Sequence, residues 1–261
     1  MLYGLQPERQ QVQERFKMSL REATYADLVL ASKVLAAAFK GEGLHGPFFH
    51  PYQEQYPDEM YLYFLQKLRL DWVAGPPDRR IILAIEGPAE QSSAQTIAGV
   101  SIWERKRAEP RAHTLIKDAN MKAMEWYNYL ESFIYPNRAA EPNNLTLLQR
   151  TDPFIKHHWT GTRADGWYLD LLGVDPAHGG KGIGRQLVAW GRGRAAEEGV
   201  VASLIASEGK ERFYQACGFD VVGMCSDEGG EANEISKVGG GKILFWDNGI
   251  EPRGIKKYGE V

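Results

Sequence analysis

The stretch Trp167–Phe219 decides the fold; it reads WYLDLLGVDPAHGGKGIGRQLVAWGRGRAAEEGVVASLIASEGKERFYQACGF. Its pattern predicts a strand, a glycine-rich turn, a helix, a second strand and a short second helix. Glycine lets the backbone approach a ligand closely, and the first N–H groups of a helix have no partner within it. We therefore expect the turn to hold a phosphate group. Tyr214, just before Gly218-Phe219, adds a titratable hydroxyl, so the stretch indicates an enzyme that acts on a phosphate-bearing cofactor.

The sequence on either side of this stretch predicts further strands and helices. Upstream, a strand at Phe16–Glu22 and a helix that follows Thr24 precede a second helix, which Gly75-Pro76-Pro77 ends. Two hairpins are also expected, and their strands are Arg80–Ile85 with Thr96–Trp103 and Asp220–Cys225 with Lys242–Trp246.

The chain is expected to hold one large domain. We divide it into a polar leader at 1–15, the domain at 16–248 and a polar tail at 249–261. The domain includes a long insertion, 105–163, with a helical pattern over Leu115–Phe133. The aromatic residues of the insertion are expected to pack mostly in the core, with some contacting a substrate: Trp126, Tyr127, Phe133 and Trp159.

The composition is that of an ordinary globular protein. Of 261 residues, 43% are hydrophobic and 25% are charged, and the formal net charge of -3 favours neither nucleic acid nor an anionic membrane as partner. No apolar run is long enough to span a membrane, and no secretory signal is evident at the start. Cys217 and Cys225 are too few for a disulfide framework or a metal site, so we expect reduced thiols in a cytoplasmic protein.

Two well-known phosphate-binding motifs do not match the turn. A nucleotide-binding P-loop needs Ser or Thr after Gly-Lys, whereas Gly182-Ile183 follows Lys181. A dinucleotide-binding fold needs Gly-x-Gly-x-x-Gly, but Arg185 or Leu187 stands where the third glycine is required. Too few strand–helix units follow the turn for that second fold.

The turn and the residues after it resemble motifs A and B of the GNAT superfamily of acyl-CoA-dependent N-acyltransferases. Motif A is a strand ending in Val-x-Pro, then Gln/Arg-x-x-Gly-x-Gly/Ala, and is present as Val174-Asp175-Pro176 and Gly179–Gly184. Gly179 replaces the Gln or Arg of the family, so one side-chain contact to phosphate is missing while the backbone donors remain. Motif B is present as Phe213-Tyr214 and, three residues later, Gly218-Phe219.

This resemblance implies an α/β GNAT fold: a central mixed, mostly antiparallel sheet with helices on both faces and a helical insertion between strands three and four. It also implies acetyl-CoA as co-substrate, with its pantetheine arm beside the fourth strand. The N–H of Leu172 is expected to polarise the thioester carbonyl. The residues assigned to the cofactor are Leu172, Val174, Gly179, Gly180, Lys181, Gly182, Ile183 and Gly184.

Two residues are candidates for proton transfer. Tyr214 matches the general-acid position of the family and would donate a proton to the CoA sulfur. Asp170 is the only carboxylate within the fourth strand, and alternation places it on the same face as Tyr168 and Leu172. Burial would raise the pKa of Asp170, which suits a general base. The alternatives for the base are Glu208, Glu104 and a chain of water molecules.

The predicted function is transfer of an acetyl group to a primary amine by direct attack on the thioester. A small-molecule acceptor is favoured, because no charged stripe indicates a macromolecule. Family members are often dimers, so a homodimer is compatible with the resemblance. The alternative is a non-catalytic acyl-CoA-binding or regulatory module on the same fold, and transfer of a longer acyl group also stays open.

Overall fold

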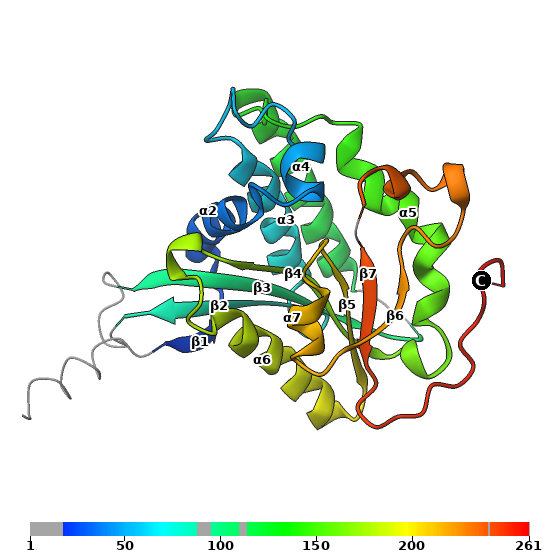
Figure 1. Cartoon of the computed structure of the whole chain (residues 1–261). Helices are drawn as coiled ribbons and strands as arrows, with labels where there is room; N and C mark the ends of the chain where they lie inside the picture. The colour runs from blue at the N-terminus through cyan, green and yellow to red at the C-terminus, as the bar shows by residue number, and fades with distance from the viewer. Residues whose placement is uncertain (1–17, 88–94, 110–113, 240, 261) are drawn as a thin grey trace, which may run out of the picture.

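The computed structural model describes residues 18–87, 95–109, 114–239 and 241–260, so the predicted leader lies outside the described residues. Over these ranges, a single mixed sheet of seven strands forms the centre of the molecule, in the order β1-β2-β3-β4-β5-β7-β6 (Figure 1). Every neighbouring pair is antiparallel except β4 with β5. The strands are β1 (Ser19–Glu22), β2 (Arg79–Glu86), β3 (Thr96–Lys106), β4 (Gly166–Val174), β5 (Val201–Ala206), β6 (Asp220–Met224) and β7 (Lys242–Trp246).

Helices cover both faces of this sheet (Figure 1). They are α2 (Leu28–Phe39) and α3 (Met60–Ala74) on one face, and α6 (Ile183–Glu198) and α7 (Glu211–Gln215) on the other. Leu35 and Phe64 are buried in the first layer, and Trp103 and Leu187 in the second. The predicted α/β class, with a mixed, mostly antiparallel sheet between helices, is confirmed.

Local sequence signals position several of these helices. Asp27 accepts hydrogen bonds from the backbone N–H and the hydroxyl of Thr24, both at 2.7 Å, which caps the start of the α2 region. Gly75 ends α3 with a φ of 50°, which glycine adopts without strain. At Gly191 of α6 a Cβ would lie 2.2 Å from the Trp103 ring, so only glycine lets the helix pack this closely.

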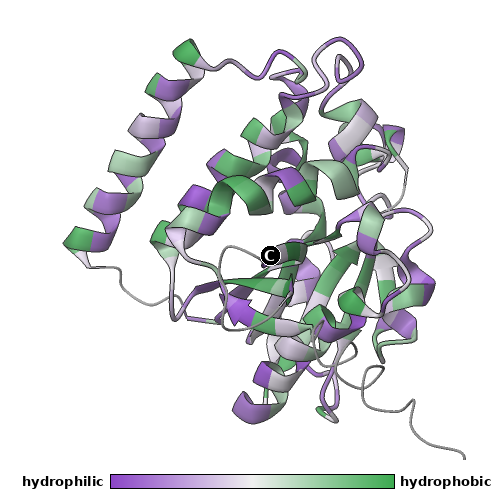
Figure 2. Ribbon diagram, turned by 90° about the vertical axis from the view of Figure 1, so that its left-hand side faces the viewer, coloured by the Kyte–Doolittle hydropathy of each residue, from purple (hydrophilic) through white to green (hydrophobic). Residues whose placement is uncertain are grey.

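The insertion between β3 and β4 adds two helices beside this core. They are α4 (Leu115–Ile134) and α5 (Leu147–Ile155). Arg69 of α3 pairs with Glu131 of α4 and donates a hydrogen bond to Asn128 Oδ1 at 3.1 Å. α4 forms one edge of the molecule (Figure 2). Within the described ranges, no helix has both the length and the apolar character needed to cross a bilayer.

The structure corrects the expected burial of the insertion aromatics. Trp126, Tyr127 and Phe133 are 63%, 48% and 69% exposed. Trp126 and Phe133 point away from the face of α4 that contacts α3, and the Tyr127 ring packs at the edge of that face against Arg69 of α3. Trp159 is partly buried as expected, and its Nε1 donates a hydrogen bond to Ser203 Oγ at 2.9 Å. Three of these four aromatic residues therefore lie outside the core.

β4 and β5 pair over only part of their length. Their pairing begins at Gly166 with Val201 and ends at Leu169 with Leu204. Beyond this point both strands continue, without pairing to each other. The facing edges of the two strand ends therefore leave backbone groups available to a ligand.

A β-bulge in β4 changes the direction of the side chains that follow it. The register shifts between Ile102 and Trp103 of β3, which leaves Asp170 without an opposite residue. Tyr168 and Asp170 face the α3 side of the sheet, whereas Leu172 packs on the α6 side. The expected common face of all three residues is therefore wrong for Leu172, because strict alternation fails at a bulge.

Candidate active site

The glycine-rich turn lies between the end of β4 and the start of α6. Gly180 and Gly182 both have a φ of 77°, a left-handed conformation that suits glycine. A Cβ at either position would meet no atom within 4 Å, so the space beside the turn is open. The N–H groups of residues 180–185 have no hydrogen-bond partner in the described part of the chain. Open space beside unpaired donors at a helix start is a geometry that binds phosphate.

Two basic side chains beside the turn, Lys181 and His178, already have an acidic partner. Lys181 Nζ lies 3.1 Å from Glu86 Oε1, and His178 Nε2 lies 2.8 Å from Glu86 Oε2. The N–H of Gly179 donates to the carbonyl of Pro176 at 3.2 Å. The N–H of Gly179, one of the predicted cofactor residues, is therefore not available to a ligand. The turn offers a ligand mainly the backbone N–H groups that follow Gly179.

The other predicted cofactor residues surround the first turn of α6. Ile183 is 2% exposed and anchors the helix in the core, so only its backbone can face a ligand. A Cβ at Gly184 would lie 3.1 Å from Phe213 and 3.7 Å from Leu172, which places these residues together. Val174 ends β4 where the turn begins. The fold gathers these residues near the separation of β4 and β5, and their cofactor role stays a prediction.

Tyr214 lies on the α6 side of the sheet. Its ring packs edge-on against Phe213 and Phe219, with centroids 4.9 Å and 6.4 Å away. Burial raises the pKa of Tyr214, so the hydroxyl keeps its proton at neutral pH. No described residue forms a hydrogen bond with this hydroxyl, so its proton is available for donation.

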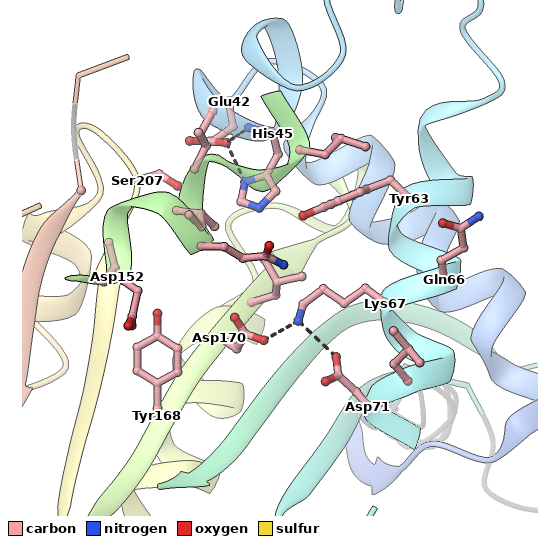
Figure 3. Close-up of a pocket in the computed structure, with 18 of the residues that line it drawn as sticks. Glu42, His45, Tyr63, Gln66, Lys67, Asp71, Asp152, Tyr168, Asp170 and Ser207 are labelled. Atoms are coloured by element: carbon pink, nitrogen blue, oxygen red, sulfur yellow. Dashed lines mark hydrogen bonds and ion pairs between the residues drawn. The ribbon is translucent and has the colours of Figure 1, made fainter. Parts of the chain in front are cut away.

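On the opposite face of the sheet lies a cavity of about 1110 Å³ (Figure 3). Leu171 from the end of β4 and Ala206 from the end of β5 both line it. Its other walls come from α3, α4, α5 and a π-helical turn at Leu44–Phe48. A cavity of this size can hold a small molecule.

A cluster of five acidic and basic side chains lies at the β4 wall of the cavity, and four of them line it. Lys67 Nζ lies between two carboxylates, 2.6 Å from Asp170 and 3.4 Å from Asp71 (Figure 3). Arg79 lies 3.0 Å from Asp170 and 3.3 Å from Asp71, and also contacts Glu104 at 3.1 Å. The cluster therefore joins α3 to β2, β3 and β4 through compensated charges.

This cluster overturns the pKa expected for Asp170. Burial alone would raise the pKa of Asp170, but Lys67 and Arg79 outweigh burial and hold it at about 2. A carboxylate with such a low pKa is a weak proton acceptor near neutral pH. Sequence reasoning missed both cations, because only the fold brings α3 and β2 to β4. The four-residue spacing of Lys67 and Asp71 is a local signal for one of these ion pairs.

A second polar pair, Glu42 with His45, lies on another wall of the cavity (Figure 3). Glu42 Oε2 accepts hydrogen bonds from His45 Nδ1 at 3.0 Å and from the His45 backbone N–H at 2.7 Å. Because a carboxylate can only accept, the neutral ring carries its proton on Nδ1, and Nε2 has no hydrogen-bond partner among the described residues. Burial would raise the pKa of Glu42, but the hydrogen bond from His45 lowers it.

Sequence reasoning also missed this pair, since no motif marks it. Its one structural signal is the π-helical turn that carries His45, a conformation often found at functional sites. The ring lies between Phe39 and Phe49, with centroids 4.7 Å and 5.3 Å away, which fixes its orientation. An imidazole held in this way can accept a proton from a molecule in the cavity.

Three exposed carboxylates lie around the cavity without a cationic partner among the described residues. They are Glu125 of α4, Asp152 of α5 and Glu208 just after β5. Glu208 was one of the alternative bases; Glu104, another, does not line the cavity and pairs with Arg79. These uncompensated charges make the rim negative, which attracts cations.

The comparison with protein families identifies the segment that carries the turn. A family model described as Acetyltransferase (GNAT) domain matches residues 154–221. Residues 154–221 are therefore similar to GNAT acetyltransferase domains. This GNAT segment includes β4, α6, β5 and α7, and therefore the glycine-rich turn and Tyr214. Acetyl-CoA, the co-substrate expected from the sequence, agrees with an acetyltransferase domain.

Several solved structures are similar to the chain over most of its length. The GNAT fold is shared with a Corynebacterium glutamicum protein described as histone acetyltransferase HPA2 and related acetyltransferase (18% identity, TM-score 0.54, 90% of this chain and 98% of that one covered). The PaiA N-acetyltransferase of Thermoplasma acidophilum, solved with coenzyme A, has 15% identity, a TM-score of 0.48, and coverage of 88% and 99%. No curated protein matches the sequence.

Proposed function

We propose that this protein transfers an acetyl group from acetyl-CoA to a primary amine of a small, positively charged molecule. The observation that carries the proposal is the separation of β4 and β5 beyond Leu169 and Leu204. This opening lies between the glycine-rich turn on the α6 side and the cavity on the α3 side. The two binding surfaces that acetyl transfer requires thus flank one gap in the sheet.

The residues at the turn fit the diphosphate of acetyl-CoA. The free N–H groups of residues 180–184 would hold it, since the space beside Gly180 and Gly182 is open. The unpaired edge of β4 at residues 171–174 would hold the arm that follows. When bound, acetyl-CoA supplies an activated acetyl group.

The charge around the cavity supports a cationic acceptor. Glu125, Asp152 and Glu208 have no ion-pair partner within the described ranges, so they would attract a protonated amine. Lys67 and Arg79 do not cancel this charge, because three carboxylates already surround them. A second positive group on the acceptor would therefore improve its binding.

His45 is the residue best placed to take the proton from the attacking amine. Its Nε2 has no hydrogen-bond partner within the described ranges, its Nδ1 is held by Glu42, and the ring lines the cavity. We assign this role to His45 rather than to Asp170, whose pKa of about 2 makes it a poor base.

Tyr214 would serve as the proton donor. Its raised pKa keeps the hydroxyl protonated on the α6 side of the opening. The proton acceptor, His45, and the proton donor, Tyr214, would then lie on opposite faces of the sheet. We also propose a cytoplasmic location, since Cys217 and Cys225 are free thiols.

A thiol-release assay tests this proposal. Native protein and acetyl-CoA are mixed with amines of similar size that carry no, one or two further positive charges. We expect release that depends on the amine and increases with its charge. The alternative, a non-catalytic acyl-CoA-binding module, predicts calorimetric binding of acetyl-CoA without thiol release from any amine. Failure of the native protein to bind acetyl-CoA would refute both.

A further inference from the structure

The outer face of α4 carries an apolar seam. Its residues follow one another at alternating steps of three and four: Ile116, Ala119, Ala123, Trp126, Leu130 and Phe133. This heptad spacing places the side chains along one face of a helix, as in helices that pair with each other. All six residues are exposed. The seam spans 17 residue steps, or about 26 Å at the rise of an α-helix.

The seam faces away from the rest of its own chain. Asn128 and Glu131, on the opposite side of α4, contact Arg69 of α3, and Met121 lines the cavity. Figure 2 shows α4 at one side of the molecule, with its outer side clear of the other described elements. Within the described part of the chain, this apolar face therefore has no partner.

The area of the seam matches that of a stable interface. Trp126, Leu130 and Phe133 are 63%, 58% and 69% exposed, Ile116 is 73% exposed, and Ile134, next to the seam, is 72% exposed. Because a buried aromatic side chain hides roughly 150–250 Å², these residues and their neighbours expose on the order of 700 Å². A monomer rarely exposes so large an apolar patch, and a stable dimer hides about 800 Å² per partner.

The seam is complementary to itself in one orientation. Its N-terminal half carries Ile116 and two small residues, Ala119 and Ala123, and its C-terminal half carries Trp126, Leu130 and Phe133. A parallel, in-register pair would place each residue opposite the same residue of the partner. Two tryptophans would then overfill the contact at one level, and two alanines would leave a gap at another. An antiparallel pair places Ala123 opposite the partner's Trp126 and Ala119 opposite the partner's Leu130. Trp126 and Leu130 then each face an alanine of the partner, Phe133 faces the partner's Ile116, and the helix dipoles oppose each other.

We propose that the protein forms a two-fold symmetric dimer through antiparallel α4 helices. The partner that covers the seam is a second copy of this chain, because a surface that is complementary to itself forms a symmetric dimer. The inner face of α4 lines the cavity, so the dimer would also hold this wall in place. The proposal does not depend on the proposed acetyl transfer.

Sedimentation equilibrium of the full chain tests the proposal. We expect the native protein to have twice its chain mass of 29.3 kDa. Leu130→Glu, which places a charge in the seam, should reduce the mass to that of one chain. The matched control is Leu30→Glu on α2, because Leu30 and Leu130 are 57% and 58% exposed. A monomeric native protein, or equal effects of the two substitutions, would overturn the dimer.

A paired exchange tests the orientation. Ala123→Trp and Trp126→Ala should each weaken the dimer about tenfold or more, since one overfills the contact and the other leaves a gap. The double variant exchanges the large and small residues and should return the dissociation constant to near the native value. A double variant as weak as the sum of the two single changes would rule out antiparallel pairing. Helical content measured by circular dichroism shows that each variant is folded.

Discussion

The two faces of the sheet offer different chemistry where β4 and β5 separate. On the α6 side, the turn offers backbone N–H groups, and Lys181 and His178 beside it are paired with Glu86. On the α3 side, the cavity is lined by ionised side chains such as Glu42 and Asp170. One surface depends on backbone shape and the other on side-chain charge. Substitutions on the two faces should therefore change different kinetic and binding constants.

The largest effect is expected on the cavity side, from His45→Gln. Loss of the proton acceptor should lower kcat by roughly 10²–10⁴-fold, with acetyl-CoA affinity unchanged. Steady-state kinetics over a pH series should also lose the limb of the profile that reports the base. The matched control is His158→Gln, which lies outside the cavity and should keep native kinetics. Equal losses in the two variants would mean that His45 is not the base.

The next effect is expected on the turn side, from Gly182→Asp compared with Gly182→Asn. Asn and Asp both tolerate the left-handed conformation at this position and have similar size. The added negative charge should weaken acetyl-CoA binding roughly 100-fold more in the Asp variant, because it repels a diphosphate. Calorimetry measures both constants. Similar affinities of the two variants for acetyl-CoA would show that the turn does not bind the diphosphate of the cofactor.

Asp170→Asn should act on stability more than on catalysis. Removing this carboxylate leaves Lys67 less compensated, so the free energy of unfolding should fall by about 3 kcal/mol near pH 7. The pKa of Asp170, about 2, lies below its ordinary value of 3.8. Its stabilising contribution is therefore complete above about pH 5 and lost as the pH falls toward 2. Urea unfolding near pH 7 and near pH 3 should show the difference between native protein and variant shrinking.

The control for this substitution is Asp220→Asn, at an exposed position of β6. It should leave the stability near the native value at both pH values. If Asp170→Asn instead removed the basic group from the pH profile of kcat while stability stayed native, Asp170 would be the base after all.

The smallest effect is expected at the cavity rim. Combining Glu125→Gln, Asp152→Asn and Glu208→Gln should raise the KM of a doubly charged amine roughly tenfold at low ionic strength, with kcat unchanged. Added salt should reduce the difference, because it screens exposed charges. A neutral amine is the control and should show the same KM in both proteins. A change in KM that does not depend on salt would mean that the substitutions act through altered packing and not through charge.

The difference between the two faces also explains what the sequence could predict. The turn side depends on neighbours in the chain. The turn at Gly179–Gly184, the strand before it and the helix after it were therefore predicted correctly. The cavity side depends on contacts between distant segments. Lys67 and Arg79 reach Asp170 only through the fold, and no motif marks His45.

Two further errors have the same physical origin. The bulge at Asp170 arises from the pairing of β4 with β3, which the β4 sequence does not encode by itself. The exposure of Trp126 and Phe133 could not be predicted from their apolar character, because burial also depends on whether another surface covers a helix.

The most direct test of the central claim uses a conjugate in which the sulfur of CoA is joined through an acetyl bridge to a diamine. If the turn and the cavity are the two halves of one site, the conjugate should bind at least roughly 100-fold more tightly than CoA alone. Both Gly182→Asp and the triple rim variant should weaken its binding in calorimetry. A conjugate that binds no more tightly than CoA, or that the rim substitutions do not affect, would contradict the account.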